Sequence, residues 1–154
     1  MSLHLNMLVP PPAALLIGTA SIWGLSEWLP ATGFDMPAQA WLAGLLFAAG
    51  LGLMIAAAGS LQKAHTTINP IWPDHAKHLV TSGIYRYSRN PIYVGDALIL
   101  TGMVFWFGNW LGMVIVGLFV IFIDRVQIRA EEAALHRLFG EGYQNYIARV
   151  RRWL

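Results

Sequence analysis

The chain has 154 residues, of which 56% are hydrophobic and only 12% are charged, with a net charge of +2. Soluble domains are about one quarter charged, so this composition excludes an ordinary water-exposed surface and indicates a single membrane-embedded domain over residues 1–154. The chain contains no cysteine, which excludes disulfides, thiolate metal sites and cysteine nucleophiles. The small excess of basic residues follows from membrane topology, and we expect no nucleic-acid partner.

The first two apolar stretches are long enough to cross a bilayer as helices, which takes about 17–25 residues. The first covers about residues 13–29 and is entered through prolines 10–12. We expect it to be retained and not cleaved as a signal peptide, because no Lys or Arg precedes it. The second, at 38–61, is rich in Gly and Ala. Small residues allow close helix contacts in lipid, so we expect it to pack inside the bundle.

The third and fourth apolar stretches, at 92–107 and 110–123, are separated only by Gly108 and Asn109 and should form a helical hairpin. All ten basic residues lie in 62–91 or in 124–154, and none lies in the other connections. The positive-inside tendency therefore places these two parts and both termini in the cytoplasm. The expected fold is an all-α polytopic membrane protein with four transmembrane helices.

The last helix is predicted to continue from the membrane into the cytoplasm as far as Gly140, a residue suited to a helix C-cap. Apolar residues recur at helical spacing along it and predict one packed face: Ile121, Ile128, Leu135 and Leu138. Glu131 projects from the middle of this face and needs a cation or a hydrogen-bond donor opposite it. Its neighbour Glu132 is either a site residue or a solvated carboxylate in a helical ion pair.

A short stretch between the second and third spans, GIYRYSRNPIYVG at 83–95, concentrates tyrosine and arginine. Three tyrosines within nine residues are interleaved with Arg86 and Arg89. Tyrosine is enriched at membrane interfaces, which is the alternative explanation. We favour a binding site, because a loop that only connects two helices does not need this combination.

RNPIYVG, followed after a hydrophobic hairpin by a Glu-Glu pair, resembles the two-part motif of membrane-embedded methyltransferases. These include isoprenylcysteine carboxyl methyltransferases and phospholipid N-methyltransferases. The wider resemblance covers 78–95 and 129–154, roughly the C-terminal half. The family usually has Arg-His-Pro where this chain has Arg89-Asn90-Pro91, and Pro where Ile84 stands. Asparagine keeps the hydrogen-bonding capacity of histidine but cannot titrate near neutral pH.

The resemblance implies S-adenosylmethionine as the methyl donor. Tyrosine faces and carboxylates suit its sulfonium and ammonium groups. Tyr85, Tyr93 and Glu131 are therefore the main candidates for binding the cofactor. The resemblance adds further cofactor-binding candidates: His78, Leu79, Val80, Gly83, Asn90 and Pro91. The remaining histidines have no acidic ligand set beside them, so we expect no metal site.

Two further residues are candidates for catalysis on the acceptor. Arg89 can orient a carboxylate or phosphate bidentately, as the matching arginine is thought to do in family members that act on carboxylates. A carboxylate acceptor needs no general base, whereas an amine needs one, for which Glu132 or Asp96 can serve. The alternative role of Asp96 is to neutralise Arg86 or Arg89.

The sequence therefore predicts a multi-pass membrane methyltransferase whose active site faces the cytoplasm. Its acceptor would be lipophilic, either a small molecule or a prenylated protein. Arg149, Arg151 and Arg152 beside Trp153 resemble a patch for anionic membrane lipids, and the Gly-rich second span can mediate a homodimer. Two alternatives stay open. One is an NADPH-dependent sterol-type reductase, although such enzymes usually have more membrane spans. The other is a non-catalytic lipid-binding bundle, for which Asn90 in place of the usual histidine is the best support.

Overall fold

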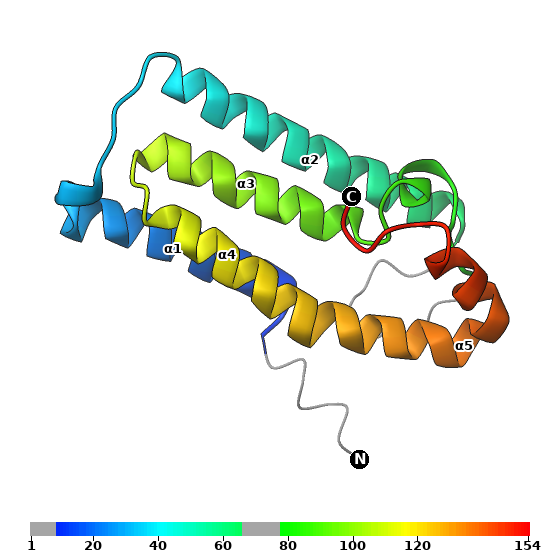
Figure 1. Cartoon of the computed structure of the whole chain (residues 1–154). Helices are drawn as coiled ribbons and strands as arrows, with labels where there is room; N and C mark the ends of the chain where they lie inside the picture. The colour runs from blue at the N-terminus through cyan, green and yellow to red at the C-terminus, as the bar shows by residue number, and fades with distance from the viewer. Residues whose placement is uncertain (1–8, 66–77) are drawn as a thin grey trace.

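The computed structural model describes residues 9–65 and 78–154. These residues are helical throughout apart from loops and one isolated β-bridge, which confirms the all-α prediction. The four bundle helices and the fifth, which continues beyond them, are α1 (Pro11–Trp28), α2 (Gln39–Lys63), α3 (Pro91–Phe107), α4 (Gly112–Phe122) and α5 (Arg129–Ile147). Figure 1 shows α3 between α2 and the pair formed by α1 and α4.

Helices α2 and α3 approach each other most closely at Gly50 and Gly95. A Cβ added to Gly50 would lie 2.6 Å from the carbonyl oxygen of Gly95, and one added to Gly95 would lie 2.7 Å from the carbonyl oxygen of Gly50. Any side chain would therefore push two backbones apart, which is why glycine occupies both positions. Ala43 and Ala57 continue this seam, and together with Gly50 they are the buried residues of α2.

The rest of α2 is exposed or half-buried, so the expectation that it packs inside the bundle is wrong. Trp41 is 83% exposed, Leu45 67% and Ile55 64%. The small residues bring one side of α2 onto α3, and no other long helix of the described ranges lies against its outer side (Figure 1). Among the described residues, α2 is the helix long and apolar enough to cross a membrane. A helix with this much exposed apolar surface is suited to lipid.

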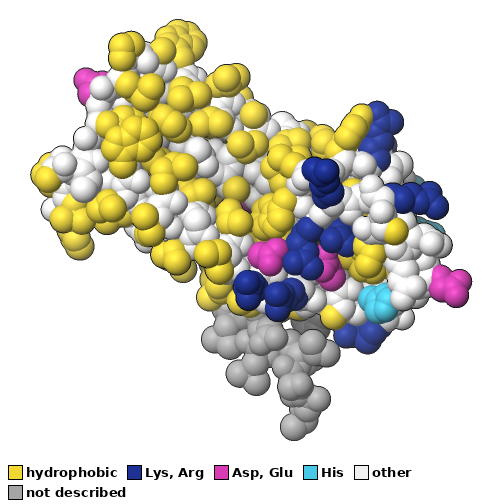
Figure 2. Space-filling view, viewed as in Figure 1, with side chains coloured by type: hydrophobic (Ala, Val, Ile, Leu, Met, Phe, Trp, Pro, Cys, Tyr) yellow, Lys and Arg dark blue, Asp and Glu magenta, His cyan; other side chains and the backbone are white. Residues whose placement is uncertain are grey.

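The two ends of the bundle differ in chemistry. Figure 2 shows hydrophobic side chains over the bundle, and Lys and Arg gathered where α5 lies. We call this the basic end, and the opposite end, formed by residues 29–38 and 108–111, the far end. The far end is closed by Asn109, which is fully buried. Its amide donates to the carbonyls of Leu25 and Leu29, both at 3.1 Å, and its Oδ1 accepts from Thr32 Oγ1 at 2.9 Å.

The path from α4 to α5 contains one turn of π-helix, at Ile123–Ile128 (η5). A π-turn holds an extra residue and rotates the residues beyond it relative to those before it. Ile128 is accordingly fully buried, whereas Ile121 is 58% exposed and Leu138, near the outer end of α5, is 43% exposed. The predicted single apolar face is therefore wrong at Ile121 and at Leu138.

Gly140 breaks α5 with a positive φ of 48°, in the left-handed half of backbone space that favours glycine. The first helical segment therefore ends at Gly140, as the sequence predicted, but a second segment follows it directly. The chain resumes as helix as far as Ile147. This last part turns back toward α3 and brings the following residues to the basic end of the bundle (Figure 1).

The α2–α3 seam leads to a prediction about stability. We expect Gly50→Ala to lower the stability of the folded protein by about 1–3 kcal/mol, because its methyl group meets the backbone of α3. Gly52→Ala is the matched control, since a Cβ at Gly52 meets nothing within 4 Å. That variant should be neutral or more stable by up to about 1 kcal/mol, owing to higher helix propensity. Thermal unfolding in detergent measures both, and equal effects would contradict the proposed contact.

Candidate functional site

The two segments that carry the predicted site meet at the basic end of the bundle. The short helix η4 (Gly83–Arg86) and the start of α3 face the start of α5, and residues 149–153 return to the same place (Figure 1). The backbone N–H of Arg89 donates to the carbonyl of Arg151 at 3.0 Å. Segments far apart in the chain are thus joined directly beside the candidate residues.

Glu131 accepts hydrogen bonds from two neutral donors. The Tyr93 hydroxyl lies 2.5 Å from Glu131 Oε1, and Gln127 Nε2 lies 2.9 Å from the same oxygen. The expected partner opposite Glu131 is therefore present, and it is a donor, not a cation. Gln127 was not among the predicted residues, although its position four residues before Glu131 on a helix could have indicated it.

The environment of Glu131 favours its protonated form. Desolvation by burial raises the pKa of Glu131 to about 7, against the opposing effect of the hydrogen bonds from Tyr93 and Gln127. The negative charge of Glu132 raises the pKa further. A carboxyl group in this state can lose its proton near neutral pH when a positively charged group binds beside it.

Glu132 is held by two guanidinium groups from other parts of the chain. Arg152 Nη2 lies 2.5 Å from Oε2 and Arg152 Nε lies 3.1 Å from Oε1, while Arg89 Nη2 lies 3.2 Å from Oε1. The alternative reading of Glu132 as a solvated carboxylate in a helical ion pair is not what the structure shows. Both partners are long-range, and both come from segments that frame the site.

Arg152 also connects the site to the π-turn. Its Nη1 lies 3.2 Å from Asp124 Oδ1, and the indole N–H of Trp153 donates to the same oxygen at 3.2 Å. Burial disfavours the charged form of Asp124, but the bonds from Trp153 and Arg152 prevail and lower its pKa. Arg152 therefore does not belong to the exposed charges of the predicted lipid patch, although Arg149 and Arg151 are exposed.

Arg89 is mostly buried, with 13% of its side chain exposed. Its Nε atom is buried and finds no acceptor among the described residues. A buried guanidinium nitrogen without a partner is uncommon, because it loses its hydration without replacement. Among the described residues, Arg89 therefore has hydrogen-bonding capacity left for an anion.

Asp96 does not have the ion pair that was its alternative role. It is buried, with 3% of its surface exposed. Arg89 pairs with Glu132, and Arg86 contacts Tyr87, its guanidinium carbon lying 4.6 Å from the ring centre. No Lys or Arg in the described ranges forms an ion pair with Asp96, because each of these two arginines is directed elsewhere.

The start of α3 is fixed by Asn90 and Pro91, both buried. The Asn90 side-chain amide donates to the carbonyl of Arg152 at 2.8 Å, and its backbone N–H donates to Ser88 Oγ at 3.1 Å. These are hydrogen bonds that an uncharged asparagine makes well, and none of them requires a titrating ring. The departure from Arg-His-Pro therefore leaves a geometric role intact at this position.

The remaining predicted residues lie around this centre. Tyr85 and Val80 are buried together against Ala57 of α2, and Tyr146 donates to the Tyr85 carbonyl at 2.6 Å. Gly83 begins η4 beside the end of α2, and His78 and Leu79 open the second described range, exposed and half-buried respectively. The part of the predicted cytoplasmic connection at 66–77 is outside the described residues. Cofactor binding by this set stays a prediction.

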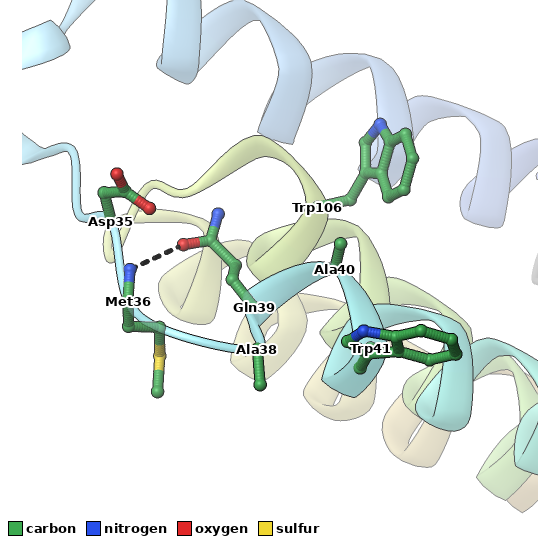
Figure 3. A pocket seen from close by; sticks show the side chains of 7 residues that line it. All are labelled: Asp35, Met36, Ala38, Gln39, Ala40, Trp41 and Trp106. Carbon is green, nitrogen blue, oxygen red and sulfur yellow. Dashed lines mark hydrogen bonds between the residues drawn. The ribbon is translucent and has the colours of Figure 1, made fainter.

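A pocket of about 430 Å³ lies at the far end of the molecule, away from all of these residues. Figure 3 shows its lining side chains, among them Trp41 and Trp106, with Gln39 Oε1 accepting a hydrogen bond from the Met36 N–H at 3.2 Å. Asp35 is its single charged residue. Both tryptophans are largely exposed, so this pocket is an open recess at the bundle surface, and the paired polar groups at the basic end are the stronger candidate site.

The raised pKa of Glu131 predicts a pH-dependent stability. At low pH the Glu131 carboxyl is protonated in both the folded and the unfolded chain. Its pKa is 4.5 in the unfolded chain and about 7 in the folded protein, so between these values the unfolded chain loses its proton first. The free energy of unfolding therefore falls as pH rises through this range. Glu131→Gln cannot titrate and keeps the oxygen that accepts both hydrogen bonds. We therefore expect it to gain stability relative to the native protein, by at most about 3 kcal/mol, between about pH 5 and pH 8. Thermal unfolding across this range measures the difference, with the exposed Glu141→Gln as control, and a pH-independent difference would contradict it.

Comparison with known proteins gives the family of this chain. Residues 38–142 match the phospholipid methyltransferase (PEMT) family. An uncharacterized protein of Haemophilus influenzae is 41% identical over 66 residues, which is 41% of this chain and 100% of that protein. The Protein-S-isoprenylcysteine O-methyltransferase of Schizosaccharomyces pombe is 36% identical over 72 residues, 47% of this chain but only 30% of that protein. No solved structure is significantly similar to the chain. The chain belongs to the phospholipid methyltransferase family and is a distant homologue of isoprenylcysteine O-methyltransferase.

Proposed function

We propose that the protein is an integral membrane methyltransferase that uses S-adenosylmethionine and methylates a lipophilic acceptor. Membership of the phospholipid methyltransferase family supports the reaction class. The observation that carries the proposal for this chain is the hydrogen bond between Tyr93 and Glu131, residues 38 apart in the sequence. It joins the two halves of the motif at one place.

The residues around Glu131 fit a cationic methyl donor. The hydrogen bonds from Tyr93 and Gln127 both reach Glu131 Oε1, and Oε2 accepts none from the described residues. A free carboxylate oxygen next to tyrosine rings suits an ammonium group, a sulfonium or a ribose hydroxyl. When bound, the donor would supply a methyl group activated by its positive sulfur. Glu131 would be stabilised in its charged form by that cation, and Tyr93 would fix the orientation of the carboxylate.

The acceptor side is assigned to Arg89. Its buried Nε has no acceptor among the described residues, and Nη2 makes its one ion pair within the same ranges, to Glu132; Arg89 is therefore able to bind an anionic group. Methyl transfer is an in-line displacement, so holding acceptor and donor in line would supply much of the rate. A carboxylate acceptor would react without a base, whereas an amine would need Glu132 or Asp96, which has no ion pair within residues 9–65 and 78–154. In this scheme the basic end faces the cytoplasm, and the acceptor, a small lipid or a prenylated group, enters from the membrane.

The first test is a titration of the detergent-purified protein with S-adenosylmethionine, with NADPH in parallel, by calorimetry. Saturable binding of the methyl donor alone supports the proposal. Saturable binding of NADPH alone would replace it with the sterol-type reductase. A folded protein that binds neither would be the non-catalytic lipid-binding bundle.

Two substitutions separate the roles proposed for the donor side and the acceptor side. We expect Glu131→Ala to abolish binding of S-adenosylmethionine, because the carboxylate oxygen is removed. Arg89→Ala should keep donor binding and lower methyl transfer by about 10- to 100-fold, the effect of losing a hydrogen bond to a charged group. Isothermal titration and transfer of labelled methyl groups measure these effects.

The matched controls are Glu141→Ala, an exposed glutamate of the same helix, and Arg86→Ala, an exposed arginine of the same loop. Both controls should behave as the native protein does. If Glu131→Ala binds the donor normally while folded, the donor site is wrongly assigned. If Arg89→Ala loses donor affinity and keeps its turnover at saturation, the acceptor role of Arg89 is wrong.

A further inference from the structure

Glu132 is shared unequally by its two arginines. Arg152 reaches both carboxylate oxygens, through Nη2 at 2.5 Å and Nε at 3.1 Å. Arg89 reaches one oxygen, through Nη2 at 3.2 Å. Two parallel N–H···O bonds make the stronger and more directional pair. Arg152 is therefore the main partner of Glu132, and Arg89 is held only at one corner of its guanidinium.

If Arg152 were absent, Arg89 would pair with Glu132 through two of its nitrogens instead of one. Its Nε is buried without an acceptor among the described residues and lies on the same guanidinium as the Nη2 that already contacts Glu132. A carboxylate left with a single cation in a partly buried place gains most by pairing with it bidentately. Glu132 would then occupy both of these nitrogens, and the anion-binding capacity of Arg89 would be lost.

Arg152 is itself held in place from several directions. Its Nη1 lies 3.2 Å from Asp124 on the π-turn, and its carbonyl accepts the side-chain amide of Asn90 at 2.8 Å. The preceding carbonyl, of Arg151, accepts the Arg89 backbone N–H at 3.0 Å, and the following residue, Trp153, donates to Asp124. The backbone that carries Arg152 is thereby bonded to the same loop that carries Arg89.

We propose that Arg152 is a positioning residue: by neutralising Glu132 it keeps the Arg89 guanidinium available for the anionic group, carboxylate or phosphate, of the acceptor. This rests on the proposed function only in assigning Arg89 to the acceptor. In the resulting site Arg152 holds Glu132, and Arg89 remains able to bind a ligand. The exposed neighbour Arg151 contributes a backbone carbonyl to this arrangement, so its side chain should not matter.

The test compares two pairs of lipophilic probes that differ in one charge. The carboxylate pair is N-acetyl-S-farnesylcysteine and its methyl ester, and the phosphate pair is oleoyl lysophosphatidic acid and monooleoylglycerol. Dissociation constants are measured by calorimetry in detergent for the native full-length protein, Arg152→Gln, Arg152→Lys and the control Arg151→Gln. Donor affinity and the thermal unfolding midpoint are recorded for each, so that loss of folding is recognised.

We expect the native protein to bind the charged member of one pair more tightly than the neutral member, and that pair identifies the anion. Arg152→Gln should weaken the charged probe by about tenfold or more, leave the neutral probe unchanged, and leave donor affinity within about twofold. Arg152→Lys should restore part of the loss and Arg151→Gln should show none. Adding Glu132→Gln to Arg152→Gln should restore binding of the charged probe, because it releases Arg89.

Each other outcome overturns the inference. Equal affinity of the native protein for the charged and neutral members of both pairs would mean that Arg89 is no anion site. Equal weakening of both members by Arg152→Gln, or no rescue by Glu132→Gln, would make Arg152 a purely structural residue. Failure of the proposed function shows separately, as absent binding of S-adenosylmethionine by the native protein while the charged probe still binds.

Discussion

The site depends on compensating two neighbouring carboxylates that are both largely withdrawn from water. Consecutive side chains of a helix point about 100° apart, so Glu131 and Glu132 face different neighbouring segments. Glu131 meets the neutral donors Tyr93 and Gln127, whereas Glu132 meets the guanidinium groups of Arg89 and Arg152. Burial raises the pKa of Glu131 against the opposing effect of the hydrogen bonds from Tyr93 and Gln127, whereas Glu132 is held in ion pairs with both arginines. One helical turn thus organises α3, the loop before it and the segment after α5.

The rest of the fold gives this turn a rigid frame. Tyr93 lies two residues before Gly95, where α2 and α3 are in backbone contact, so its hydroxyl is positioned by the tightest seam of the bundle. At the far end, Asn109 ties the α3–α4 turn to the end of α1 with its hydrogen-bonding groups satisfied. The π-turn then sets the rotation of α5, which decides where the two glutamates point.

A division of charge follows, and it agrees with the proposed chemistry. A carboxyl group with a pKa of about 7, whose Oε2 accepts no hydrogen bond from the described residues, suits a ligand that brings its own positive charge. A guanidinium whose Nε has no acceptor in the described part of the chain suits a ligand that brings negative charge. Methyl transfer from a sulfonium donor to an anionic lipophilic acceptor needs both kinds of place side by side. Neutralisation of Glu132 by Arg152 would keep the positive charge of Arg89 from being used up by the neighbouring carboxylate.

Composition and motif spacing determined much of this protein from the sequence alone. Apolar stretches predicted the helices because hydrophobicity is local, and the spacing of Glu131 on its helix predicted that a donor would face it. Only the tertiary structure decided which groups pair. Glu132 pairs with Arg152, twenty residues away, instead of a partner on its own helix. Asp96 pairs with neither of the two arginines expected for it, and α2 buries a single stripe of small residues. Such pairings depend on which segments the loops bring together and on the rotation of α5, which one π-turn changes. Neither can be deduced from the spacing of residues in the sequence.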